Sequence, residues 1–144
     1  MARLAGILEC CIYADDLAAA EAFYAGVLGL EPFAREPGRH VFFHAGPTSV
    51  FLVFDPARTS DPAAHSVVGG VPVPRHGATG PGHVAFSVAE AELPSWRERL
   101  VDAGVAVEAE IEWPRGGRSI YVRDPAGNSV ELATPRIWGL AEDR

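Results

Sequence analysis

The feature that most constrains this chain is an internal repeat, whose copies fall at about residues 5–55 and 81–134. Each copy runs through an alternating apolar segment, a segment with helical spacing, a glycine, and apolar segments that flank a tight turn. One helix signal enclosed by strand signals predicts a βαβββ unit. We therefore expect an α+β fold, in which two such units form curved mixed sheets around a central cavity and make one domain.

Local signals place the elements of each unit. In the first copy we expect strands over 7–13, 31–33, 40–44 and 49–54, and a helix over 17–28. Asp15 or Asp16 should cap that helix, and Gly29 should end it. In the second copy we expect strands over 83–88, 105–112, 118–123 and 129–133, and a helix over 93–103. Residues 55–81, rich in proline and glycine, read as a linker that is long for a connection within a compact domain.

Composition and charge exclude several classes of protein. The chain has 144 residues, of which 48% are apolar, so a core can form without disulfides or structural metals. The only cysteines, Cys10 and Cys11, are adjacent, which argues against a disulfide framework and favours the cytoplasm. A net charge of -7 without a basic cluster disfavours nucleic acid and anionic membranes as partners. No apolar run approaches the ~20 residues of a membrane helix.

Strand periodicity divides the side chains of each unit between two faces. The apolar set should pack on the helix, so the other set should face the concave side. On that concave side we expect Cys11, Tyr13, Phe51 and Ser119 as cavity-lining residues, together with Glu9, His40, His83, Tyr121 and Glu131.

Glu131 is the most informative single candidate for a functional residue, because it interrupts an apolar strand. A buried carboxylate without a partner is costly. A divalent cation would resolve that cost, and so would Arg118 or Arg123, whereas an edge strand would leave the carboxylate in water. Laying one copy over the other matches Glu9 with His83 and Phe51 with Glu131, so Glu9, His83 and Glu131 are candidate metal ligands.

Other side chains on the same face could take part in chemistry. Tyr121 could donate a proton or a hydrogen bond, although an aromatic residue in a strand is also an ordinary core residue. His40 on the concave face and His76 in the linker are candidate general bases, and each is otherwise a solvent-exposed histidine. We interpret Cys11 as a small apolar residue in the wall of the cavity rather than as a nucleophile.

The segments 13–17, 23–30, 82–88 and 121–132 resemble the vicinal oxygen chelate superfamily. It includes glyoxalase I, extradiol dioxygenases, fosfomycin-resistance thiol transferases, methylmalonyl-CoA epimerase and bleomycin-resistance proteins. The resemblance covers nearly the whole chain and is specific for the superfamily, not for one reaction.

This resemblance implies metal ligands from the first and last strand of each unit. Glu9, His83 and Glu131 fall on three of those four positions, and Phe51, on the fourth, cannot coordinate. Relatives most often have histidine or glutamine where this chain has Glu9. Three ligands with open positions look more like the thiol transferases and dioxygenases than like glyoxalase I. Zn²⁺, Mn²⁺, Ni²⁺ and Fe²⁺ all suit such a site, and the sequence does not choose among them.

The leading functional hypothesis is a divalent-metal-dependent enzyme that acts on a small oxygenated substrate as a lyase, isomerase, thiol transferase or dioxygenase. The metal would bind two neighbouring substrate oxygens and act as a Lewis acid. The alternative is a metal-free small-molecule or antibiotic binding (resistance) protein, for which the acidic charge would suit a cationic drug. A purely structural module is disfavoured by the inward polar residues. A homodimer is the expected assembly; in relatives the units pair within one chain or across a dimer.

Overall fold

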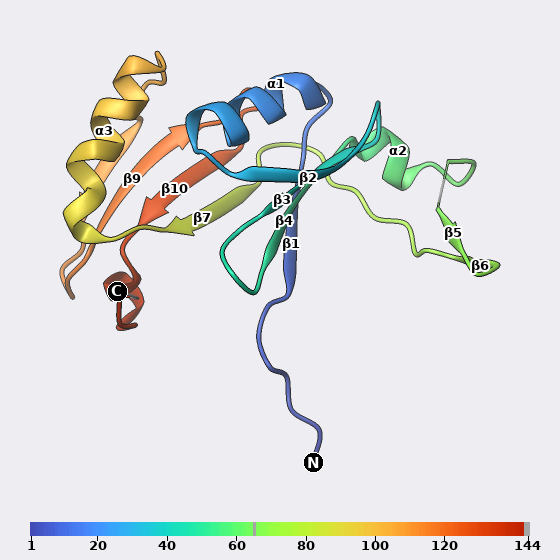
Figure 1. The fold of residues 1–144 in the computed structure, drawn as a ribbon, viewed down its shortest axis with the longest axis horizontal. Coiled ribbons are helices and arrows are strands. Elements are labelled where there is room, and N and C mark those ends of the chain that lie inside the picture. The colour runs from blue at the N-terminus through green and yellow to red at the C-terminus, as the bar shows by residue number, and fades with distance from the viewer. Residues whose placement is uncertain (65, 143–144) are drawn as a thin grey trace. The chain divides into compact units, whose positions relative to one another are not determined.

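The computed structural model describes residues 1–64 and 66–142, and the chain divides into two compact units, Met1–Gly80 and Pro81–Arg144. Figure 1 shows the elements of both units along the chain. Unit 1 contains β1 (Glu9–Tyr13), α1 (Leu17–Glu21), a π-helical turn η1 (Ala22–Val27), β2 (Glu31–Glu36), β3 (His40–His44), β4 (Val50–Phe54), α2 (Pro56–Ser60), β5 (Val67–Val68) and β6 (Val71–Pro72). Unit 2 contains β7 (His83–Ser87), η2 (Glu90–Glu92), α3 (Leu93–Asp102), β8 (Ala109–Glu112), β9 (Arg118–Arg123), β10 (Ser129–Ala133) and η3 (Pro135–Trp138).

Each unit has the same sheet topology. The strand order is β1-β4-β3-β2 in unit 1 and β7-β10-β9-β8 in unit 2. In each sheet the first strand runs parallel to the fourth strand of its βαβββ repeat, β1 with β4 and β7 with β10, and the other neighbours are antiparallel. The predicted α+β fold with two βαβββ units is thereby confirmed. That both units together make one domain stays a prediction.

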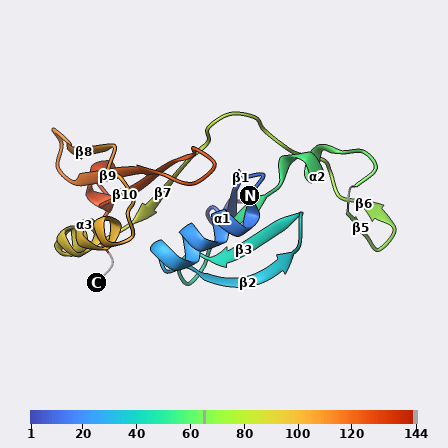
Figure 2. The same ribbon diagram turned by 90° about the horizontal axis from the view of Figure 1, so that it is seen from above.

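The core of unit 1 lies between its helix and one face of its sheet, and Figure 2 shows α1 lying along that sheet. Asp16 caps the helix, because its Oδ1 accepts a hydrogen bond from the Ala19 N–H at 2.9 Å. Tyr24 is fully buried, and its ring packs on Phe51 and Phe43 with centroid separations of 4.9 and 5.9 Å. Gly29 ends the helix with a φ of 77°, which a residue with a side chain rarely adopts.

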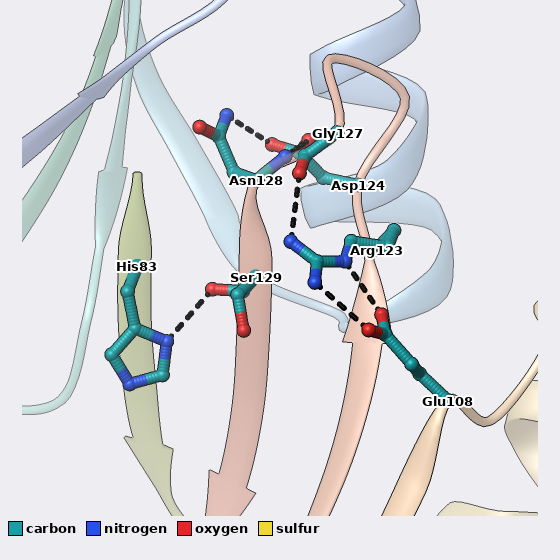
Figure 3. A network of polar contacts seen from close by, with 7 residues as sticks. All are labelled: His83, Glu108, Arg123, Asp124, Gly127, Asn128 and Ser129. Atoms are coloured by element: carbon teal, nitrogen blue, oxygen red, sulfur yellow. Dashed lines mark hydrogen bonds and ion pairs between the residues drawn. The ribbon is translucent and has the colours of Figure 1, made fainter. Parts of the chain in front are cut away.

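Unit 2 is built in the same way around α3. Leu93 and Leu100 of the helix are buried, and so are the apolar side chains of the sheet that alternate with the polar ones. The turn between β9 and β10 is closed by Asp124, whose Oδ1 accepts hydrogen bonds from the N–H groups of Ala126 and Asn128. Figure 3 shows Asp124 beside Asn128. The Asn128 side-chain oxygen in turn accepts from the Gly82 N–H at 2.7 Å. This contact fixes the start of β7, where His83 lies.

The segment predicted as a linker contains a short helix, α2, and two short strands, β5 and β6. Asp55 caps α2 through the Ala57 N–H, with Pro56 at the first helical position. Further along, the His76 N–H donates to the Thr59 carbonyl at 3.2 Å, which ties the segment back to α2. In the described part of the chain, no helix is both long and apolar enough to cross a bilayer.

The strand register corrects one sequence prediction. Glu9 pairs with Val50 in unit 1, and His83 pairs with Ser129 in unit 2. The counterpart of Glu131 is therefore Leu52, not Phe51. Phe51 was predicted to line the concave face; it lies instead on the helix-packing face, fully buried against Tyr24. The prediction was wrong by one residue because it aligned the serines of two similar turns, and a one-residue slip moves every side chain to the other face.

Candidate functional site

Glu131 is a buried carboxylate with a dedicated donor. It lies on β10, between β7 and β9, and only 5% of the residue is exposed. Its Oε1 accepts a hydrogen bond from the Ser119 hydroxyl at 2.5 Å, and Ser119 accepts one from the Trp113 indole N–H at 2.8 Å. Its Oε2 lies 3.3 Å from the Nε2 of His83.

Two of the readings left open for Glu131 are now excluded. The carboxylate is not in water, because β10 is an interior strand and the side chain is buried. Neither predicted arginine neutralises it, since Arg118 pairs with Glu112 and Arg123 pairs with Glu108 (Figure 3). The polar partners of the carboxylate are instead Ser119, His83 and the Tyr121 hydroxyl.

His83 is oriented by a second contact. Its Nδ1 lies 3.1 Å from the carbonyl oxygen of Ser129, as Figure 3 shows. A carbonyl oxygen only accepts hydrogen bonds, so Nδ1 carries a proton and Nε2 is directed at Glu131. Nε2 then either carries a second proton and donates it to the carboxylate or offers its lone pair to a metal ion. The imidazole is half exposed, which leaves it accessible to a ligand.

Tyr121 completes this face of unit 2. It is the direct cross-strand neighbour of Glu131 and its ring stacks on His83, with a centroid separation of 6.3 Å and an interplanar angle of 20°. Burial raises the pKa of the Tyr121 hydroxyl, and contact with the Glu131 carboxylate raises it further against a smaller opposing contribution from Ser119. The hydroxyl is therefore protonated at neutral pH and can donate a hydrogen bond.

Trp113 was missed by the sequence analysis. It follows β8 directly and continues the alternation of Ala109 and Ile111, which are the register partners of Tyr121 and Ser119. That alternation, carried from Ile111 to the first residue after the strand, was the available signal. The indole N–H fixes the Ser119 hydroxyl, so that the hydroxyl hydrogen is left for Glu131.

The corresponding face of unit 1 is aromatic. Glu9, Cys11 and Tyr13 share the face of β1 that is turned away from the helix, as predicted. The Tyr13 hydroxyl lies 2.7 Å from the Nδ1 of His76, and the His76 ring lies edge-on to Phe54 at 4.8 Å. Burial and the neighbouring Cys11 thiol raise the pKa of Tyr13 to about 12. His76 was read from the sequence as an exposed histidine; it is exposed, yet it also holds this tyrosine.

His40 lies on the same aromatic face. Its ring stacks on Phe42 with a centroid separation of 3.9 Å, and its buried Nδ1 has no hydrogen-bond partner among the described residues. Glu36 is the nearest acid, with its Oε2 at 3.8 Å from that nitrogen. Burial lowers the pKa of His40; Glu36 opposes this effect and Arg39 adds to it. The imidazole is thus neutral at neutral pH, as a general base must be before it accepts a proton.

The His83–Glu131 pair fits a divalent metal ion. Two ligand atoms that each lie about 2.1 Å from one ion, on neighbouring coordination positions, are roughly 3.0–3.4 Å apart. The 3.3 Å between Nε2 and Oε2 falls in that range. Each ligand also has an outer partner, Ser129 for His83 and Ser119 for Glu131, as metal ligands require for orientation.

His83 and Glu131 supply two candidate metal ligands. Among the described residues, no group of three or more histidine, cysteine, aspartate or glutamate side chains is arranged to hold a metal ion. Glu9 belongs to unit 1, and its participation stays a prediction.

Comparison with known proteins identifies the family of this chain. The family model "Glyoxalase/Bleomycin resistance protein/Dioxygenase superfamily" matches residues 6–132. The chain belongs to this superfamily. The resemblance drawn from the sequence motifs is confirmed.

The most informative solved structure is that of a lactoylglutathione lyase from Agrobacterium tumefaciens. It is 43% identical to this chain, with a TM-score of 0.85, over 95% of this chain and 98% of the lyase chain. A glyoxalase/bleomycin resistance protein/dioxygenase from Nocardioides shares the fold at 24% identity and a TM-score of 0.69, covering 93% of this chain and 85% of that one.

Curated relatives match over shorter segments. The metallothiol transferase FosB of Bacillus licheniformis is 40% identical over 57 residues, which are 39% of this chain and 37% of the relative. The FosB of Shouchella clausii is 38% identical over 56 residues, or 36% of this chain and 37% of the relative. The match thus spans little more than a third of either relative.

Proposed function

We propose that this protein is a divalent-metal-dependent enzyme of its superfamily that acts on a small oxygenated substrate. The observation that carries this proposal is the buried Glu131 carboxylate, whose Oε2 meets His83 Nε2 at 3.3 Å while separate partners orient both side chains. A buried acid raises the free energy of the folded state unless a cation or good donors compensate it. Function is the simplest reason to keep such an arrangement.

We propose His83, Glu131 and Glu9 as the metal ligands. Glu9 is supported by its register position, because it occupies in β1 the place that His83 occupies in β7, and by its location on the face turned away from the helix. One nitrogen and two carboxylate donors suit Zn²⁺, Mn²⁺, Ni²⁺ or Fe²⁺. When bound, the metal would polarise substrate oxygens as a Lewis acid.

The remaining residues would act on the substrate or on the ligands. Ser119 and Trp113 hold Glu131 in place and keep its Oε2 directed toward His83. Tyr121, protonated because its pKa is raised, would donate a hydrogen bond to a substrate oxygen. His40, neutral because burial lowers its pKa, is the proposed base.

Within the superfamily we favour a lyase or thiol transferase over a dioxygenase. The lactoylglutathione lyase and the metallothiol transferases named above support this choice, because both names refer to compounds or groups derived from thiols. Leu52 stands at the fourth ligand position and cannot coordinate, so a metal would keep an open position for substrate oxygens, which favours a thiol transferase over glyoxalase I.

Metal content of protein purified without chelator tests this proposal. We expect about one ion per site in the wild type and a large loss in Glu131→Gln, which keeps the size of the side chain and removes its charge. Glu112→Gln is the matched control, since Glu112 is an exposed carboxylate of the same sheet. Equal metal content in the wild type and Glu131→Gln would refute the proposal.

One observation favours the alternative, a metal-free binding protein. The aromatic side chains on the concave-side face of unit 1, with Phe33, Phe42 and Phe54 beside His40, offer stacking surfaces, and the net charge of -7 suits a flat cationic ligand. Metal-free protein that binds such a cation tightly, and gains nothing from added metal, would establish this second function.

We also propose a homodimer in the cytoplasm. Cys10 and Cys11 are both free and exposed, which suits a reducing compartment. Light scattering at tens of micromolar, the order of ordinary assay concentrations, should show a dimer.

A further inference from the structure

A cavity lies within unit 2, between the loop that follows β8 and the C-terminal segment. It has a volume of about 380 Å³. Its walls are formed by Trp113, Arg115, Arg136, Ile137, Trp138 and Gly139. Pockets for small molecules range from roughly 300 to 1,000 Å³, so this cavity is large enough for a single-ring compound.

The backbone fixes the shape of this cavity. The loop from Trp113 to Gly117 is closed by two main-chain hydrogen bonds, from the Trp113 N–H to the Gly117 carbonyl at 3.0 Å and from the Gly116 N–H to the Trp113 carbonyl at 2.9 Å. Gly117 has a φ of +85°, and a Cβ there would lie 2.7 Å from Ile137. Only glycine therefore lets the loop approach η3 this closely, and the two walls are held together before any ligand binds.

The charges at this cavity differ from those elsewhere in unit 2. Three arginines, Arg97, Arg118 and Arg123, pair with carboxylates, and Arg99 lies over the Trp96 ring at 5.5 Å. Among the described residues, Arg115 and Arg136 form no ion pair, although acidic side chains outnumber basic ones in the chain. Two guanidinium groups without an acidic partner thus lie at one cavity, and their charge is available to a ligand.

We propose that this cavity binds a small organic anion, namely a carboxylate or phosphonate carried on a flat apolar body. The guanidinium groups of Arg115 and Arg136 match the planar, bidentate geometry of such an anion. The indoles of Trp113 and Trp138 offer faces on which the apolar body can stack. Trp138 is 79% exposed in the described structure, an unusual position for so large an apolar side chain without a partner.

The cavity adjoins the candidate metal site through one chain of hydrogen bonds. Trp113 lines the cavity, and its indole N–H donates to Ser119, which donates to Glu131. The proposal itself does not require the metal, because neither arginine touches Glu131 or His83. It goes beyond the proposed function by adding a site for the anionic end of a ligand.

Nuclear magnetic resonance of the whole 144-residue chain tests this proposal, with phenylphosphonate as the probe. The chain has three tryptophans, and their indole N–H signals report on separate places. Trp113 and Trp138 line the cavity, while Trp96 lies on α3 beside Arg99. We expect a saturable shift of the Trp113 and Trp138 signals and none of the Trp96 signal. Inorganic phosphate, which lacks the ring, and benzyl alcohol, which lacks the charge, should each bind about tenfold more weakly.

Substitutions then identify the residues. Arg115→Gln, at an exposed position where folding is not at risk, and Arg136→Gln should each weaken phenylphosphonate binding by roughly fivefold. The matched control Arg99→Gln should leave binding unchanged. Glu131→Gln should also leave it unchanged, since it removes the metal site and not the cavity.

Three results would overturn the proposal. The first is the absence of a saturable shift, and the second is an unchanged affinity in both Arg115→Gln and Arg136→Gln. The third is loss of binding in Glu131→Gln alone, which would place the anion on the metal. Inorganic phosphate binding as tightly as phenylphosphonate would refute the part of the proposal that assigns an apolar body to the ligand.

Discussion

The two sheets share one topology and one register, yet the same face carries different chemistry in each. Where unit 2 has Glu131, Tyr121 and Ser119, unit 1 has Leu52, Phe42 and His40 at the equivalent pairing positions. Unit 2 thus surrounds a buried acid with donors, whereas unit 1 presents aromatic rings. The comparison teaches that a duplicated backbone fixes where side chains lie but not what they do, because a buried charge needs donors supplied by neighbouring strands.

The largest expected effect concerns the helix-packing face of unit 1. Phe51→Ala should lower the free energy of unfolding by about 3–5 kcal/mol, because the ring is fully buried against Tyr24. Urea unfolding measures this loss. A small loss together with impaired ligand binding would restore the original prediction that Phe51 lines the concave face.

The next prediction concerns a carboxylate introduced into unit 1 at the position equivalent to Glu131. Leu52→Glu puts a carboxylate at the counterpart of Glu131, where Phe42 stands in place of Tyr121 and no serine takes the part of Ser119. Because Leu52 is 7% exposed, we expect unfolding free energy to fall by roughly 2–4 kcal/mol. The control Leu8→Glu, at a residue that is 72% exposed, should change stability by about 0.5 kcal/mol or less. Equal effects of both substitutions would contradict the comparison between the units.

A smaller effect is expected from the donor to Glu131. Ser119→Ala removes the hydroxyl that donates to Oε1 and leaves a buried carboxylate oxygen without it. The cost should be about 1–3 kcal/mol in the metal-free protein, measured by urea unfolding. Ser87→Ala, on the exposed end of β7, is the matched control and should be nearly neutral. A neutral Ser119→Ala would mean that the hydrogen bond contributes nothing to holding the acid.

The smallest effect is a dependence of stability on pH. Burial lowers the pKa of His40 in the folded protein below its ordinary value of 6.5, although Glu36 opposes the shift and Arg39 supports it. The unfolded chain therefore binds a proton at His40 more readily than the folded protein does. The free energy of unfolding is thus unaffected by this residue above pH 6.5 and falls as the pH drops below that value. His40→Gln should flatten the decline in unfolding free energy on the acid side of neutrality. His44→Gln, at an exposed residue of the same strand, should leave the decline as in the wild type.

Most of the fold could be predicted from the sequence, because its signals are local. The Asp16 cap, the Gly29 stop and the alternation in each strand all act within a few residues. The faces of β1, β7, β9 and β10 followed from the same alternation. Phe51 failed because the register across strands depends on pairing that no local signal reports, and Ser49 and Ser129 gave a false alignment.

The partners within the site were harder to predict than its members. Glu131 and His83 were identified as ligand-type residues, but the choice of Ser119 rather than an arginine as donor depends on which strands are neighbours. The contact between His76 and Tyr13 joins residues that are far apart in sequence, and the spacing of a proline-rich segment gives no sign of it. Long-range contacts of this kind are decided by packing.

The central claim is that the buried acid of unit 2 serves a metal ion, and thermal unfolding with and without added metal tests it most directly. Metal that binds only the folded state raises the thermal midpoint. We expect a clear rise in the wild type and in Glu112→Gln, and little change in Glu131→Gln, whose metal-free fold should remain intact because glutamine can still accept the Ser119 hydrogen bond. Equal rises in the wild type and Glu131→Gln would mean that Glu131 is not a ligand, and the account would be wrong.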